Sequence, residues 1–185
     1  MGVRSREILR ELIAFPTVSV EPNRALIDYC ADLLTACGAR VEIIPDEAAG
    51  KANLFATLGP PDRPGVLLSG HTDVVPVEGQ AWSKPPFELT EEAGKLFGRG
   101  TCDMKGFVAA ALACAESVDP RTLKTPLHFA LSYDEEIGCV GVHSLLDMLK
   151  PAAIKPLLCI VGEPTQLQVA TGHTGKLAAR ITCTG

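Results

Sequence analysis

The sequence alternates between short apolar runs, typical of buried strands, and longer amphipathic stretches, typical of helices. The helices that we expect are 5–15, 22–37, 107–117 and 141–149. The strands that we expect are 41–44, 53–58, 66–68, 127–131, 157–161 and 177–182, with a small hairpin made by 88–90 and 95–97. Because strands that alternate with helices pair mostly in parallel, the pattern predicts an α/β domain: a mostly parallel (mixed) sheet with helices on both faces.

Composition and charge exclude several kinds of partner. The chain has 185 residues, enough for one domain with a sizeable core, and a net charge of −5. Its Lys and Arg residues are scattered, whereas phosphate binding needs them clustered, so we expect no nucleic-acid partner. No apolar run approaches the ~18 residues of a membrane span, so we expect no membrane insertion.

The seven cysteines indicate a reducing environment. Their number is odd and no C-x-x-C motif occurs, which argues against a disulfide framework and against a cysteine zinc site. Most of them lie in apolar or helical stretches, where free thiols are usually buried. We therefore expect free, mostly buried thiols and a cytoplasmic location.

A histidine and an aspartate follow the apolar run 66–68. His71 and Asp73 are two positions apart, and residues at that spacing in an extended chain point to the same side. Open α/β sheets bind their ligands at the carboxyl ends of strands. Further acidic residues recur where other expected strands stop, namely Asp103, Glu135, Glu136 and Glu163.

A divalent metal explains why so many carboxylates could share one crevice. Crowded carboxylates repel each other and lose solvation unless cations compensate them. Imidazole nitrogen and carboxylate oxygen are both zinc ligands. Two zinc ions would balance Asp103, Glu136 and Glu163 together with a bridging hydroxide, which is the nucleophile that paired metals generate. Glu135 is then placed to act as general base, and Asp73 to accept the other N–H of the histidine.

Each acidic residue also has a simpler explanation. Asp103 could cap the helix that follows it, and Glu163 could be a turn residue. Glu135 and Glu136 could be an acidic step before a helix, where the helix dipole favours carboxylates. On that interpretation the chain is an α/β domain that binds no stoichiometric metal. All these explanations would have to hold at once, although the candidates share one edge of one expected sheet.

Four segments resemble one enzyme family. They are SGHTDVVP (69–76), GRGTCDMKG (98–106), SYDEEIGCVG (132–141) and VGEPT (161–165). In this order they are similar to the dinuclear zinc amidohydrolases, a family that includes acetylornithine deacetylase, succinyl-diaminopimelate desuccinylase, aminoacylases and glutamate carboxypeptidases. The segments 80–83 and 101–107 most resemble the acetylornithine deacetylase branch of that family.

The resemblance implies a metal-ligand set and two catalytic residues. The implied ligands are His71 and Glu163 on one zinc ion, Glu136 on the second, and Asp103 as the bridge between them. The implied catalytic residues are Glu135, as general base, and Asp73, which orients the histidine. The implied cofactor is two zinc ions per complete site, which cobalt could replace.

The resemblance also implies a longer protein than this truncated chain. Members of the family carry a lid domain and a second metal histidine near the far end. We therefore expect residues 1–170 to be the N-terminal part of a zinc-peptidase-like catalytic domain. Residues 171–185 resemble the linker and first strand of the lid, through which the full-length enzyme would form a homodimer. The family also tends to have a cis peptide bond after the bridging aspartate, here between Asp103 and Met104.

The activity that the resemblance implies is hydrolysis of N-acetyl-L-ornithine to L-ornithine and acetate, a step of arginine biosynthesis. The expected chemistry is attack by a metal hydroxide, with Glu135 as general base. An alternative of the same class is another N-acyl-amino-acid amidohydrolase or a succinyl-diaminopimelate desuccinylase. The substrate is in each case a small N-acyl amino acid. An alternative of a different class is a non-catalytic metal-binding fragment.

Overall fold

The computed structural model describes residues 1–172, 174–175 and 179–184. Its main element is a five-stranded mixed sheet with the strand order β1-β2-β6-β3-β7. The bounds of these strands are Arg40–Asp46 for β1, Lys51–Leu58 for β2, Leu127–Ser132 for β6, Val66–His71 for β3 and Leu158–Val161 for β7. A separate two-stranded hairpin consists of β4 (Thr90–Glu92) and β5 (Lys95–Phe97).

Four of the five strands in the main sheet run in the same direction. The neighbours β6, β3 and β7 are parallel, while β2 pairs antiparallel with both β1 and β6. The strands β1 and β2 form a hairpin because only residues 47–50 separate them, and Gly50 in that turn has a φ of +64°. The expected mostly parallel, mixed sheet is therefore confirmed.

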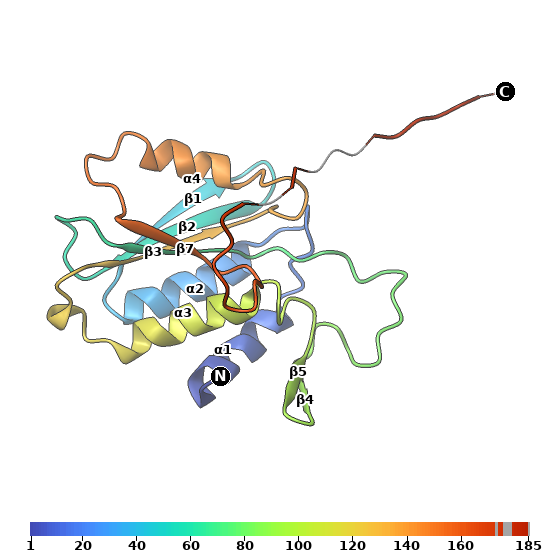
Figure 1. Ribbon diagram of the computed structural model, residues 1–185, viewed down its shortest axis with the longest axis horizontal. Coiled ribbons are helices and arrows are strands. Elements are labelled where there is room, and N and C mark those ends of the chain that lie inside the picture. The colour runs from blue at the N-terminus through green and yellow to red at the C-terminus, as the bar shows by residue number, and fades with distance from the viewer. Residues whose placement is uncertain (173, 176–178, 185) are drawn as a thin grey trace.

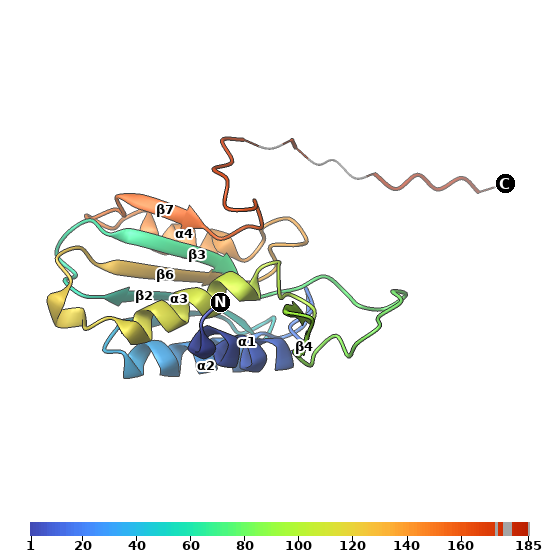
Figure 2. The same cartoon turned by 60° about the horizontal axis from the view of Figure 1, so that its bottom comes forward.

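Helices cover both faces of the sheet. Three of them, α1 (Val3–Ala14), α2 (Arg24–Ala36) and α3 (Lys105–Ser117), lie together on one face, and α4 (Val142–Leu149) lies on the other (Figures 1 and 2). The three-helix face holds the larger apolar core, which includes Ile8, Leu34, Leu112 and Phe129. A smaller cluster under α4 contains Leu67, Ala130 and Leu145.

Short-range signals in the sequence account for how several elements end. The helix α2 ends where Gly38 adopts a φ of +82°, and the amide of Ala39 donates to the carbonyl of Leu34 at 3.0 Å.

The helix α3 is rich in alanine, and its buried residues include Ala109 and Ala115, so it packs closely on the sheet. Among the described residues, no helix has both the length and the apolar content that a membrane span requires.

Three expectations differ from the structure. The first hairpin strand is Thr90–Glu92 rather than 88–90, because the two-residue turn Ala93-Gly94, with φ of +50° and +73°, sets the register. The expected strand 177–182 lies partly outside the described residues, and residues 179–182 are not in a strand. All seven cysteines are free as expected, but the prediction that most are buried is wrong, since five of them are exposed.

Candidate metal centre

The histidine and the acidic residues come together at the carboxyl ends of three parallel strands. His71 is the last residue of β3, Glu135 and Glu136 follow β6, and Glu163 follows β7. Because β6, β3 and β7 are adjacent and parallel, the segments that follow them meet at one edge of the sheet. Asp103 reaches the same place from the loop that precedes α3.

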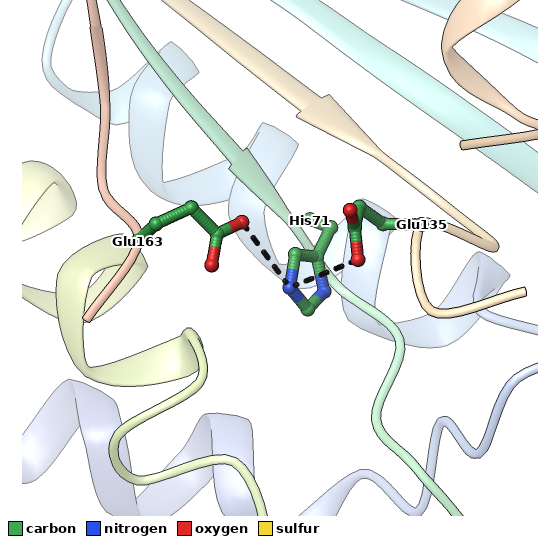
Figure 3. A group of neighbouring side chains, drawn as sticks. All are labelled: His71, Glu135 and Glu163. Atoms are coloured by element: carbon green, nitrogen blue, oxygen red, sulfur yellow. Dashed lines mark ion pairs between the residues drawn. The ribbon is translucent and has the colours of Figure 1, made fainter. Parts of the chain in front are cut away.

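His71 is the centre of this cluster, which we call the acidic cluster (His71, Asp103, Glu135, Glu136 and Glu163). Its Nε2 atom lies 3.0 Å from Asp103 Oδ1. The same atom lies 3.9 Å from a carboxylate oxygen of Glu135 and 3.9 Å from one of Glu163, which approach the ring from opposite sides (Figure 3). Candidate ligand atoms of His71, Asp103 and Glu136 lie within 4.8 Å of one another. The structure thus brings together all the acidic residues that the sequence singled out, but Asp103 comes from the loop before α3 and not from the end of a strand in the main sheet.

The other nitrogen of the His71 ring faces Asp73. Nδ1 lies 2.9 Å from the backbone carbonyl oxygen of Asp73 and 3.4 Å from its carboxylate oxygen Oδ1. Asp73 therefore offers this nitrogen two acceptors, of which the main-chain carbonyl is the nearer. A proton held on Nδ1 leaves Nε2 as the nitrogen that faces the carboxylates.

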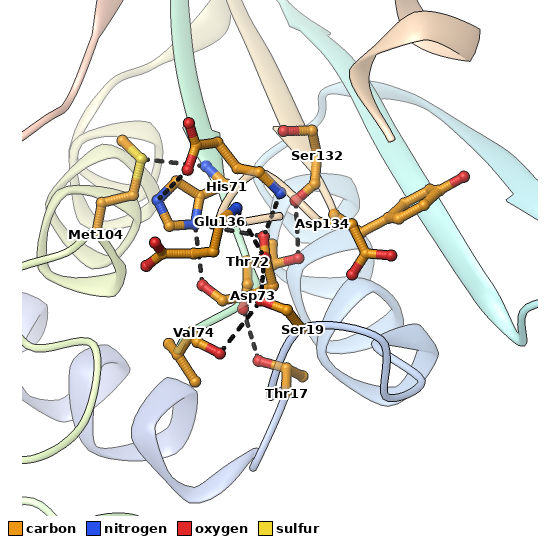
Figure 4. Close-up of polar contacts among 12 residues, drawn as sticks. Thr17, Ser19, His71, Thr72, Asp73, Val74, Met104, Ser132, Asp134 and Glu136 are labelled. Atoms are coloured by element: carbon orange, nitrogen blue, oxygen red, sulfur yellow. Dashed lines mark hydrogen bonds and ion pairs between the residues drawn. The ribbon is translucent and has the colours of Figure 1, made fainter. Parts of the chain in front are cut away.

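The carboxylate of Asp73 organises the backbone around it. It accepts hydrogen bonds from the Ser19 hydroxyl at 2.7 Å and from the backbone amides of Glu135 at 3.0 Å and Glu136 at 3.2 Å (Figure 4). Ser19 reaches this site because the segment after α1 pairs with the segment after β3, with Val74 donating to the Thr17 carbonyl at 3.0 Å. Asp73 therefore holds the segment that carries two members of the acidic cluster.

The pKa values in the site show how closely the charges are packed. Burial opposes protonation of His71, but the carboxylates of Asp73, Asp103 and Glu135 outweigh it and raise the pKa of the ring to about 9. Burial also works against the charged form of Asp73, yet hydrogen bonds from His71 and Ser19 keep its pKa below the usual value.

The pKa values of the outer carboxylates shift upward, in the opposite direction to that of Asp73. Burial, followed by the charge of Asp103, raises the pKa of both Glu136 and Glu163. The donor set is therefore one imidazole nitrogen and several mutually repelling carboxylates, which is the chemistry that a divalent cation such as zinc would stabilise. A cavity of about 220 Å³ adjoins this donor set and is lined by Asp103, Glu136 and residues 98–102 among others.

The remaining residues of interest lie away from the acidic cluster. His128 is buried in β6, where its Nδ1 lies 2.9 Å from the Thr57 hydroxyl, a position that indicates a structural role. His143 is exposed on α4, and His173 lies outside the described residues. Cys102, which neighbours Asp103, is exposed. The peptide bond between Asp103 and Met104 is cis, as expected.

Sequence reasoning did not single out three residues that support the cluster: Ser19, Lys51 and Asp134. Ser19 bonds to Asp73, and the ammonium of Lys51 pairs with the carboxylate of Asp134, the residue before Glu135. Each contact joins segments that are far apart in the chain, 54 residues for Ser19 and Asp73 and 83 for Lys51 and Asp134. Local pattern held no signal for either pairing.

Comparisons with known proteins agree with this geometry. The sequence profile of peptidase family M20/M25/M40 matches residues 67–180. Acetylornithine deacetylase of Proteus mirabilis (strain HI4320) is 41% identical over 97% of this chain and 47% of that protein. Acetylornithine deacetylase of Pasteurella multocida (strain Pm70) is 39% identical over 94% of this chain and 46% of that protein. The chain thus spans about half the length of the curated relatives that it matches.

Solved structures show the same fold. Human carnosine dipeptidase 1 superposes with a TM-score of 0.72 at 28% identity, over 85% of this chain and 38% of that one. The M20 family metallo-carboxypeptidase Sso-CP2 from Sulfolobus solfataricus gives a TM-score of 0.74 over 88% of this chain and 37% of its own, and at 22% identity it supports the fold alone. Since the family profile covers well over half of the chain, the protein belongs to peptidase family M20/M25/M40.

Proposed function

We propose that this chain carries the metal-binding part of a zinc-dependent amidohydrolase that converts N-acetyl-L-ornithine to L-ornithine and acetate. The observation that carries the proposal is the convergence of one histidine and four carboxylates at the ends of β3, β6 and β7. A solvated acidic surface would not gather these groups around one nearly buried imidazole, whose side chain is 2% exposed.

Four residues would hold the metal. His71 Nε2 and Glu163 would bind one ion, Glu136 the other, and Asp103 both, and the proximity of these groups to the ring supports the assignment. When bound, zinc supplies a Lewis acid that polarises the amide carbonyl and makes a water molecule acidic near neutral pH. Zinc suits this mixture of nitrogen and oxygen donors, and cobalt would serve as a substitute.

Two residues would act on protons and orientation. Glu135 has a side chain that is 36% exposed and lies beside the histidine, so it can accept a proton from the attacking water and pass it to the leaving amine nitrogen. Glu135 is as close to His71 Nε2 as Glu163 is, so its role as base rests on the resemblance to the family rather than on distance. Asp73 would keep the imidazole in the tautomer that leaves Nε2 free to bind metal.

The substrate assignment rests on the curated relatives. Several of them, at 39–41% identity over nearly all of this chain, are named acetylornithine deacetylase. Since they are about twice as long, residues 1–170 would be the N-terminal part of the catalytic domain and 171–185 the start of a lid. The additional length would supply a second metal histidine and a dimer interface. A cytoplasmic location is consistent with seven free thiols.

A first experiment measures metal binding by the chain itself. The metal-free chain is titrated with zinc against a chromophoric chelator, beside the variants His71→Ala and His128→Ala. We expect tight binding that is lost in His71→Ala and kept in the matched control, because His128 lies away from the cluster. Absence of zinc binding by the folded chain would refute the metal centre.

A second experiment measures activity in a chimera, in which residues 1–185 replace the matched half of the Proteus mirabilis enzyme. We expect release of acetate from N-acetyl-L-ornithine in preference to succinate release from N-succinyl-diaminopimelate. Glu135→Gln in the chimera should keep its zinc and lose most turnover. A folded, zinc-loaded chimera that hydrolyses neither compound would favour a non-catalytic metal-binding role.

A further inference from the structure

A buried ion pair lies directly behind the acidic cluster. Lys51 is the first residue of β2, and Asp134 immediately precedes Glu135. The Lys51 Nζ atom lies 2.5 Å and 2.6 Å from the two carboxylate oxygens of Asp134, and the side chains are only 2% and 10% exposed. The Asp134 side chain points away from the His71 ring, so the pair is not part of the proposed ligand set (Figure 4).

Asp134 has an unusual backbone conformation. Its φ is +52°, in the left-handed region that residues with a side chain seldom adopt. Contacts at several atoms hold it there: its carboxylate also accepts the backbone amide of Val20 at 2.9 Å, and its carbonyl accepts the amide of Val140 at 3.0 Å. Such a conformation persists only where the surrounding structure determines it.

This turn decides where the next two residues point. After Asp134, the amides of Glu135 and Glu136 both donate to the carboxylate of Asp73. The segment is therefore held by two aspartates, Asp73 on the side of the histidine and Asp134 on the side of β2. Asp134 is paired with the ammonium of Lys51, which also lies 5.6 Å from the centre of the Tyr133 ring.

The charge of Lys51 is needed because Asp134 is buried. A buried carboxylate that loses its cationic partner is left uncompensated, and breaking such a pair is strongly destabilising. Here the carboxylate left without its cation would be that of Asp134, which lies in a strained turn. The next two residues, Glu135 and Glu136, carry carboxylates that already repel each other. The turn would relax before the whole sheet unfolded, because β2 keeps its ladders with β1 and β6.

We propose that Lys51 and Asp134 are positioning residues: their ion pair fixes the left-handed turn that presents Glu135 and Glu136 to the metal centre. This inference rests on the proposed function, since it assigns the pair a role in metal binding. Mutation of residues that orient the metal ligands without binding the metal typically lowers metal affinity about 10- to 100-fold. We therefore expect a loss of that size when the pair is broken.

The test uses Lys51→Met, Asp134→Asn and the rescue variant Lys51→Arg in the 185-residue chain. Zinc affinity and the visible spectrum of bound cobalt are measured on folded protein. Lys51→Met and Asp134→Asn should lower the affinity about 10-fold or more and alter the cobalt spectrum, whereas Lys51→Arg should stay close to wild type. Asn tolerates a positive φ, so Asp134→Asn isolates the charge from the backbone conformation.

A control variant separates positioning from general destabilisation. Leu112→Ala removes a buried side chain of α3 that belongs to the apolar core, and it should lower stability without changing metal affinity. Folded Lys51→Met with wild-type affinity and spectrum would overturn the inference, as would an equal loss in Leu112→Ala.

Hydrogen exchange in the metal-free chain gives a reading that does not depend on metal. The amides of Glu135 and Glu136 should exchange faster in Lys51→Met than in Leu112→Ala. If wild-type chain bound no zinc, the proposed function would fail, while this exchange difference would still show whether the ion pair holds the turn. Equal exchange in both variants would refute the positioning role.

Discussion

Zinc binding to this chain should release a proton from His71 at neutral pH. The ring is nearly buried, and the carboxylates around it raise its pKa to about 9 despite the cost of burying a charge. At pH 7 the imidazole is then about 99% protonated, and it must lose that proton before Nε2 can bind a metal. The apparent affinity for zinc should therefore rise about tenfold for each pH unit up to about 9. At lower pH the raised pKa values of Glu136 and Glu163 make the affinity depend still more steeply on pH.

The same shift predicts how the stability of the metal-free chain depends on pH. The pKa of His71 is raised in the folded state from its ordinary 6.5 to about 9. Its contribution is fully present below pH 6.5 and is lost as the pH rises through 9. A shift of this size corresponds to about 3 kcal/mol of unfolding free energy. Metal-free protein should therefore become less stable over that interval.

Calorimetry measures the proton directly. Zinc is titrated at pH 7 into the chain in two buffers with different ionisation enthalpies, and the difference in heat gives the protons released per zinc. Asp73→Asn removes the carboxylate that contributes most to keeping the ring charged, so it should reduce the release. An affinity that does not change between about pH 6.5 and 8.5, with no buffer-dependent heat, would refute the proposed role of the surrounding carboxylates.

Three further predictions concern packing, thiols and surface. Leu112→Ala should lower the free energy of unfolding by about 2–5 kcal/mol in a denaturant titration, because the side chain is 1% exposed; a loss below ~1 kcal/mol would contradict the packing described for α3. Cys102 should react quickly with a thiol reagent, whereas Cys30, buried with its pKa raised to about 12, should react only on unfolding. We expect the exposed edge strand β7 to promote self-association, so Ile160→Lys should reduce it in light scattering, with stability changed by less than ~0.5 kcal/mol; unchanged association would show that this edge does not mediate it.

Local pattern in the sequence was sufficient to predict most elements and the residues of the acidic cluster. Apolar spacing reflects burial on one face, and that is why the expected helices and strands of the sheet differ from the structure by only a few residues. Four members of the cluster followed from one further rule, that parallel strands present their carboxyl ends at a common edge, whereas Asp103 lies in the loop before α3 and does not follow from that rule. His71 at the end of β3 and Glu163 after β7 meet for this reason, although 92 positions separate them in the sequence.

Contacts between distant segments were not predictable in the same way. Lys51 begins a strand and has the residue type of an exposed position, yet it is buried against Asp134. Nothing near Lys51 in the sequence indicates a partner 83 residues away. The exposed cysteines have a related cause. Cys159 lies on β7, an edge strand whose residues are all exposed, and an apolar run alone does not reveal whether another element covers it.

The distribution of burial within the site divides it into an orienting part and a binding part. His71 and Asp73 have side chains that are 2% and 3% exposed, whereas Asp103 is 46% and Glu163 39% exposed. The side chains of His71 and Asp73 are held in place by their buried surroundings. The pair can therefore fix the direction in which Nε2 of His71 points. The exposed carboxylates remain accessible to an ion and to a substrate, and their mutual repulsion makes a cation the favourable occupant. A site that binds metal while leaving one face open for a small amide needs this combination of a rigid interior and an accessible acidic rim.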